Sequence, residues 1–197
     1  MNNLLSLLRT QSFEKLLCAY KKEKIDLGHF IDGGAGSGST VREIIPFLGD
    51  NKKIYAFEPF VGNARFFDQF HDTDSVVFIP KAMSDQNCFS NFHVPSTVQK
   101  DTQWGSRGLE GYSSVGRLVG DTSKDKNVYK VQCVRCDDEL SDVGRVGFIK
   151  LDLQGGELAA LRGMPNILED CSFLWVELLS WNLDLYAFLL NLDFLIF

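Results

Sequence analysis

The sequence predicts an α/β fold in which helices cover both faces of a doubly wound parallel sheet. The main observation is that short apolar segments alternate with helical segments along most of the 197-residue chain. The second is a glycine-rich turn, residues 33–38, that follows the first apolar segment and opens a helical one. The chain is 45% hydrophobic and 23% charged, which is typical of a folded protein and excludes a disordered one.

Five apolar segments have the length and composition of buried strands. They are residues 29–32, 54–57, 76–79, 148–151 and 173–177. Apolar residues at three- and four-residue spacing predict helices between and after them. These helices are residues 41–47, 63–70, 158–168 and 183–191. A sheet of this kind binds its ligands beyond the carboxyl ends of the strands, where the strand order reverses.

One main domain with two additions is expected. Residues 1–28 begin with apolar residues at helical spacing, which predicts a helical cap before the main domain, residues 29–197. Residues 84–130 interrupt the alternation of strands and helices. Their two ends, 88–94 and 128–134, are predicted to pair as an antiparallel ribbon. The polar segment between these ends is expected to project as a lid, although a surface insertion without function would have the same composition.

Charge and hydropathy exclude two classes of partner. The formal net charge of −6 leaves no broad cationic surface for a nucleic-acid backbone. The longest uninterrupted apolar run, residues 185–190, is far shorter than the roughly 20 residues that cross a bilayer. Residues 1–20 lack the basic leader of a secretory signal. We therefore expect a cytoplasmic protein that binds neither nucleic acid nor membranes.

The five cysteines are an odd number in a chain of this length, and most are expected to be buried free thiols. Cys133 and Cys136 form a CxxC pair, but no second pair accompanies it, and the three histidines lie far apart in the sequence. No metal site is predicted.

The glycine-rich turn is compatible with three classes of ligand to different degrees. A phosphate-binding P-loop requires lysine where this chain has Ser39. A dinucleotide-binding fingerprint aligns with Gly34 and Gly36 but has Ser39 at its third glycine, so NAD remains an alternative. The third ligand is S-adenosylmethionine, whose ammonium and carboxylate groups suit a turn that combines open backbone amides with an acid. Asp32, at the end of the first strand, supplies that acid.

Glu58 ends the second predicted strand, where a doubly wound sheet places a carboxylate against a ribose. Its two oxygens can accept hydrogen bonds from both ribose hydroxyls, each worth roughly 1.5 to 3 kcal/mol. NAD-dependent enzymes also use an acid at this position, so Glu58 does not distinguish between the two cofactors.

Four blocks of the sequence carry a family resemblance. They are residues 30–40 (FIDGGAGSGST), 55–59 (YAFEP), 82–85 (AMSD) and 149–163 (IKLDLQGGELAALRG). Together they resemble the FkbM family of S-adenosylmethionine-dependent methyltransferases, over residues 29 to 180. The last block is the most specific, since the family has IK-D-x-E-G-x-E followed by LxG. This chain has Gln154 where the family usually carries glutamate.

The resemblance implies a class I methyltransferase (Rossmann-like) fold, with S-adenosylmethionine as methyl donor and a hydroxyl of a sugar or secondary metabolite as acceptor. By position, the glycine-rich turn would admit the methionine part, Glu58 would meet the ribose, and Phe60 with Ala82 and Met83 would flank the adenine. The expected cofactor-binding residues are Asp32, Gly34, Ala35, Gly36, Glu58, Pro59, Phe60, Ala82, Met83 and Asp152.

Three carboxylates are candidates for the base that takes the proton of the acceptor hydroxyl. Asp152 ends the fourth strand and is the first choice, with capping of the following helix as its alternative role. Glu157 stands in the first turn of that helix, where the helix dipole favours an acid whatever its function. Glu177 ends the fifth strand and could hold a substrate hydroxyl.

The family's seven-stranded sheet usually closes with an antiparallel hairpin. Residues 194–197 predict a sixth strand with no seventh behind it, so the last strand is expected to be missing. The sheet edge left open could be covered by a second copy of the chain. A nicotinamide-dependent oxidoreductase, disfavoured by Ser39, and a non-catalytic S-adenosylmethionine-binding module remain alternatives to the methyltransferase.

Overall fold

The computed structural model describes residues 17–18, 21–22, 26–94, 117–120, 127–179 and 182–192. Its main sheet has five parallel strands in the order β3-β2-β1-β8-β9. The strands are β1 (His29–Gly33), β2 (Ile54–Phe57), β3 (Val76–Ile79), β8 (Val146–Leu151) and β9 (Phe173–Val176). All five predicted strands are present, with ends that differ by at most two residues. The strand order reverses between β1 and β8, which is where a doubly wound sheet binds its ligands.

The helices follow the predicted alternation with two corrections: the helix at Cys136–Glu139 was not predicted, and one predicted helix is broken in two. They are α3 (Ser39–Ile44), η1 (Ile45–Phe47), η2 (Val61–Phe70), α4 (Cys136–Glu139), α5 (Glu157–Arg162), α6 (Pro165–Glu169) and α7 (Leu183–Leu190), with η marking 3-10 geometry. The single helix predicted over 158–168 was wrong, because the chain breaks between α5 and α6. Gly163 ends α5, and Pro165, which lacks an N–H group, starts α6.

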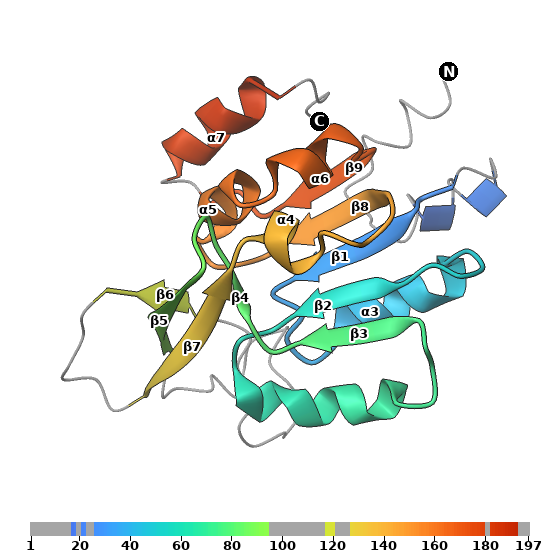
Figure 1. Cartoon of the computed structure of the whole chain (residues 1–197), viewed down its shortest axis with the longest axis horizontal. Helices are drawn as coiled ribbons and strands as arrows, with labels where there is room; N and C mark the ends of the chain where they lie inside the picture. Colours follow the sequence, from blue (N-terminus) through green and yellow to red (C-terminus); the bar gives the residue numbers. More distant parts are fainter. Residues whose placement is uncertain are drawn as a thin grey trace.

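Alternate residues of the central strands face two separate cores. On one face, Ile31 and Ile149 belong to a buried cluster that α4, α5, α6 and α7 cover. On the other face, Phe30 and Phe148 stack with ring centroids 4.8 Å apart, in a cluster that α3 and η2 cover. Figure 1 shows α3 behind β2 and β3 and α4 in front of β8, so helices cover both faces of the sheet. This is the three-layer arrangement that short, continuously apolar strands require.

A second, smaller sheet has the order β4-β7-β5-β6. Its strands are β4 (Ala82–Met83), β5 (Cys88–His93), β6 (Arg117–Val119) and β7 (Val128–Val134). β5 pairs antiparallel with β7 and β6, and β4 pairs parallel with β7. In Figure 1 the arrowheads of β1, β2, β3 and β8 point toward the side where this sheet lies. The smaller sheet therefore borders the carboxyl ends of the main strands.

Several predicted features lie outside the described residues. They are most of the helical cap, most of the lid segment between β5 and β7, and the predicted sixth strand at 194–197. Within the described part of the lid, β6 returns to the sheet and pairs with β5. Among the helices that the structure describes, none is both long and apolar enough to span a bilayer.

Candidate active site

The site begins at the reversal of strand order, between β1 and β8. These parallel strands place Asp32 directly beside Lys150, so the two side chains leave the same face of the sheet. Lys150 Nζ lies 3.1 Å from Asp32 Oδ1 and donates to the carbonyl of Gly34 at 3.1 Å. Asp32 is fully buried, and a buried carboxylate requires such a partner.

Burial and charge act in opposite directions on this ion pair. Burial raises the pKa of Asp32, and the attraction of Lys150 opposes that rise. Burial alone would lower the pKa of Lys150, but the carboxyl groups of Asp32, Asp152 and Glu58 outweigh it and raise that pKa. Lys150 therefore remains a cation that faces three acids.

The glycine-rich turn after β1 follows a path that side chains would block. Gly34 and Gly36 have φ angles of 73° and 54°, in the left-handed region that glycine adopts without strain. A Cβ atom on Gly34 would overlap the carbonyl oxygen of Asp152. The turn can therefore pack closely against the end of β8 only if residue 34 has no side chain.

The expectation that this turn offers open backbone amides was wrong for three residues. The N–H groups of Gly34 and Ala35 both donate to the carbonyl of Phe57 at 3.0 Å. The N–H group of Gly36 donates to Glu58 Oε2 at 2.9 Å. The chain satisfies these amides itself because buried N–H groups are costly to leave unpaired. A ligand can therefore approach this turn because its glycines have no side chains, and not because its amides are free.

Glu58 follows β2 and is fixed by two backbone groups. Oε2 accepts the N–H of Gly36, and Oε1 accepts the N–H of Phe60 at 2.8 Å. The residue is 5% exposed, and burial raises the pKa of its carboxyl group to about 7, although hydrogen bonds from Phe60, Gly36 and Asn63 act in the other direction. The two carboxylate oxygens have four lone pairs in all, so these three donors leave one lone pair for a further donor.

The predicted adenine-flanking residues lie between the end of β2 and the smaller sheet. Phe60 and Ala82 belong to one buried apolar cluster with residues of β5 and β7. The ring of Phe60 meets that of Tyr129 edge-on, with centroids 5.3 Å apart. Pro59 is buried beside Glu58, and the sulfur of Met83 packs against β1 at Gly33. The structure thus brings Phe60 and Ala82 together and turns Met83 toward β1.

Asp152 and Glu177 follow the neighbouring strands β8 and β9, and Gln154 joins them. Gln154 Nε2 donates to Asp152 Oδ1 at 2.8 Å and to Glu177 Oε2 at 2.9 Å. Burial, and then the neighbouring Asp152, raise the pKa of Glu177 to about 7. Asp152 Oδ2 lies 3.8 Å from Lys150 Nζ. Its alternative role as a helix cap does not hold, because Gly156 is the N-cap of α5 and no side chain caps this helix.

Glu157 has a different environment from the other two predicted catalytic carboxylates. It is fully buried, and its oxygens accept the N–H groups of Leu153, at 2.7 Å, and Gly155, at 3.0 Å. These bonds close the turn between β8 and α5. The position favours a structural role for Glu157 over direct contact with a substrate.

The site also uses residues to which sequence reasoning gave no role. Lys150 is the counter-ion of Asp32, and the signal for it was a lysine inside an otherwise apolar strand. Gln154 bridges two acids, and the signal was its departure from the family pattern. Asn63 hydrogen-bonds Glu58 from η2, and no pattern in the sequence pointed to it.

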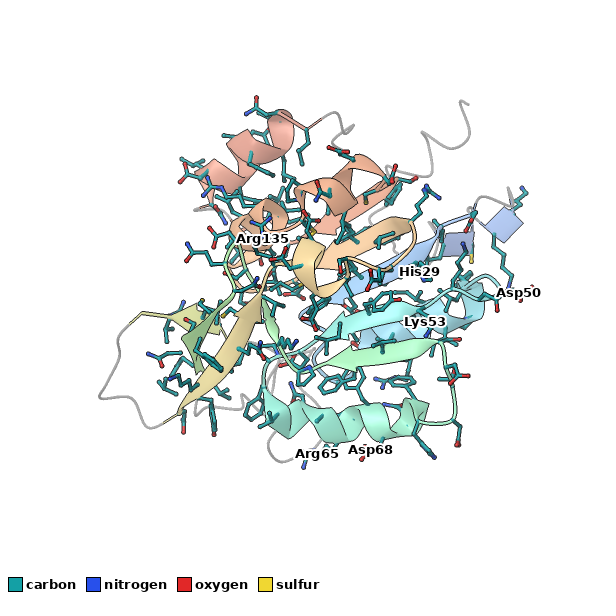
Figure 2. The ribbon with its side chains drawn as sticks, viewed as in Figure 1. His29, Asp50, Lys53, Arg65, Asp68 and Arg135 are labelled. Carbon is teal, nitrogen blue, oxygen red and sulfur yellow. The ribbon has the colours of Figure 1, made fainter. Side chains whose placement is uncertain are left out.

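His29 lies at the opposite end of the sheet from these acids. It begins β1, and its Nδ1 accepts the N–H of Lys53 at 3.0 Å. Figure 2 shows both residues near the amino ends of their strands, on the far side from Arg135 and the smaller sheet. Burial lowers the pKa of His29. Within the described residues, no group of three or more His, Cys, Asp or Glu side chains is arranged to hold a metal ion.

The fold and the site define a class of protein. A mainly parallel, doubly wound sheet with a glycine-rich turn after β1 and a buried acid after β2 is the arrangement of enzymes that bind nucleoside-containing cofactors. The Methyltransferase FkbM domain matches residues 32–195, and this chain belongs to that family. The resemblance in the sequence is thereby confirmed.

A solved structure shares the fold. The crystal structure of Methyltransferase FkbM from Methylobacillus flagellatus KT superposes with a TM-score of 0.56 and 18% sequence identity. The match covers 85% of this chain and 38% of that chain, so this chain spans well under half of that protein. At this identity the likeness concerns the fold. No curated protein matches the sequence.

Proposed function

We propose that this chain transfers the methyl group of S-adenosylmethionine to a hydroxyl group of a small molecule such as a sugar or secondary metabolite. Membership of the FkbM methyltransferase family supports methyl transfer. The observation that carries the choice of donor is Glu58, a buried carboxyl group held beside the glycine-rich turn by Gly36, Phe60 and Asn63, with one lone pair left for a ribose hydroxyl.

The residues present fit the proposed donor. Glu58 would accept a hydrogen bond from one ribose hydroxyl, and Phe60 with Ala82 would border the adenine. Asp32 Oδ2 is buried and has no hydrogen-bond partner in the described part of the chain, so it can accept from the ammonium group of the methionine part. When bound, S-adenosylmethionine supplies an electrophilic methyl carbon on a sulfonium, so the protein mainly has to orient the acceptor and remove its proton.

The carboxyl groups beyond β8 and β9 are the proposed proton acceptors. A base works best when its pKa lies near the operating pH, and the pKa of Glu177 is about 7. Asp152 and Glu177 both accept hydrogen bonds from Gln154, and Asp152 Oδ2 also lies 3.8 Å from Lys150 Nζ. We therefore place Glu177 first as the base and Asp152 beside it, which reverses the order suggested by the sequence. Glu157 would only stabilise the turn between β8 and α5.

The remaining parts of the proposal concern partners and domains. A lid formed within residues 84–130 would contact the acceptor, and residues 1–28 would form a cap. β9 lies at the edge of the described main sheet, which leaves this edge for a second copy of the chain. We propose a cytoplasmic protein with no nucleic-acid or membrane partner.

Calorimetric titration and a labelled-donor assay test this function. S-adenosylmethionine should bind and NAD should not, and methyl label should appear on one or more compounds in a panel of hydroxylated acceptors. Asp152→Asn and Glu177→Gln should lower turnover about a hundredfold with less effect on donor affinity. Asp142→Asn, at an exposed position, is the control. Donor binding without transfer to any acceptor would instead support a non-catalytic binding module, and binding of NAD alone would support an oxidoreductase.

A further inference from the structure

The turn after β8 contains one residue with an uncommon backbone and a fully used side chain. Gln154 has a φ of 54°, in the left-handed region that residues other than glycine seldom adopt. Its side-chain nitrogen carries two hydrogens and donates one to Asp152 and the other to Glu177. An ionised glutamate, which the family pattern has at this position, offers only acceptors and could make neither bond.

The turn holds Gln154 in this conformation from both sides. The N–H groups of Leu153 and Gly155, on either side of Gln154, both donate to Glu157. Gly156 also donates to the carbonyl of Leu153 at 3.2 Å. A left-handed non-glycine residue persists only where its surroundings fix it, and such strain concentrates at functional sites. The structure thus maintains a strained backbone that directs the amide group of Gln154 toward the two acids.

Two acids bonded to one nitrogen repel each other when both are ionised. Their oxygens lie 2.8 Å and 2.9 Å from Gln154 Nε2, which keeps them within the roughly 6 Å over which charges shift each other's ionisation. Glu177 also makes a side-chain hydrogen bond with Asp152, which requires a proton on one of the two carboxyl groups. Of the other charges that act on Glu177, Glu157 adds to the repulsion and Lys150 opposes it. A donor between the two acids stabilises the state in which both are ionised.

We propose that Gln154 is a positioning residue that clamps Asp152 and Glu177 into a coupled pair acting as a single proton acceptor. The role of this clamp in methyl transfer rests on the proposed function and adds a residue to its mechanism. The acceptor oxygen forms its bond to the methyl carbon, and the carbon–sulfur bond breaks with its electron pair on sulfur. The hydroxyl proton passes to the carboxyl pair. The amide favours the ionised form of that pair, so the pair can take the proton close to neutral pH.

Carboxyl titration by carbon-13 NMR tests the clamp without any substrate. The Glu177 signal is assigned by its loss in Glu177→Gln. Gln154→Gly removes the amide while glycine keeps the left-handed backbone, and Gln154→Glu replaces the donor with a third acid. The control is Asn51→Gly, because Asn51 has a φ of 60° in an exposed turn far along the chain from these acids. The control relieves the same backbone strain and leaves the acids unchanged.

We expect the pKa of Glu177 to be lowest, and equal, in the wild type and in Asn51→Gly. It should be higher in Gln154→Gly and highest in Gln154→Glu. Loss of the donor should raise the pKa by about half a unit or more, because a hydrogen bond to a carboxylate favours its ionised form. In an active enzyme, Gln154→Gly should lose rate at pH 7 and recover it at higher pH, with the KM for the donor unchanged.

Two results would overturn the clamp. One is a folded Gln154→Gly protein in which Glu177 titrates as in the wild type. The other is a folded Gln154→Glu protein in which the pKa of Glu177 is no higher than in the wild type. A protein that transfers no methyl group would overturn the proposed function instead, and the titration would still decide whether Gln154 couples the two acids.

Discussion

Lys150 Nζ lies 3.1 Å from Asp32 Oδ1, across two neighbouring strands at the centre of the sheet. Asp32 is fully buried, and the Lys150 side chain is 12% exposed. Because removing one partner of a buried pair leaves an uncompensated charge, Lys150→Met should lower the free energy of unfolding by about 3 to 5 kcal/mol. Urea denaturation measures this loss.

An exposed ion pair in the same chain provides the matched control. Lys52 lies 3.3 Å from Asp26, with side-chain exposures of 28% and 64%. Lys52→Met should cost at most about 1 kcal/mol, since water screens such pairs. Adding Asp32→Asn to Lys150→Met should restore part of the lost stability. Equal losses for the two lysine variants would contradict a buried, mutually dependent pair.

The close packing of the glycine-rich turn against β8 predicts a large effect at Gly34. Gly34→Ala would place a methyl group onto the carbonyl oxygen of Asp152 and would also strain a φ of 73°. Gly155 has a φ of 102° but open space around it, so Gly155→Ala tests backbone strain alone. Gly34→Ala should be the less stable of the two by at least about 2 kcal/mol in urea denaturation. Similar stabilities would mean that the turn can move away from β8.

The pKa of Glu58 predicts how stability depends on pH. Its value of about 7 in the folded protein exceeds its ordinary value of 4.5, so the folded state binds the proton more tightly than the unfolded state. The stabilisation this provides is complete below pH 4.5 and is lost as pH rises to about 7, up to about 3 kcal/mol. Glu58→Gln cannot titrate and should show a smaller decrease over this range.

Measuring urea denaturation at pH 5 and pH 8 for both proteins isolates this contribution. Glu177 also has a raised pKa and titrates in the same range, so it contributes to the slope of both proteins. The difference between the two slopes therefore belongs to Glu58. Parallel slopes would show that Glu58 ionises as easily in the folded protein as in the unfolded chain.

The sequence predicted the strands well because each is a short apolar run between polar turns. A strand that is buried on both faces requires this continuous apolar pattern. It also located Glu58 and Asp152, because both directly follow strands. The break after Gly163 was missed because apolar spacing continues across it. Gln154 and Lys150 stand out in the sequence, but their contacts could not be predicted, because these depend on strand register and on the conformation of one turn.

The donor-binding role of Glu58 gives the most direct prediction about function. Glu58→Ala should weaken S-adenosylmethionine binding at least about tenfold in calorimetry, because each hydrogen bond from a ribose hydroxyl to a carboxylate is worth roughly 1.5 to 3 kcal/mol. Since the pKa of Glu58 is about 7, wild-type affinity should also rise between pH 6 and pH 8 as the carboxyl group ionises. Glu58→Gln should lose this pH dependence, and Glu43→Gln, on the exposed side of α3, should retain it. A change of less than twofold in Glu58→Ala would show that the ribose lies elsewhere.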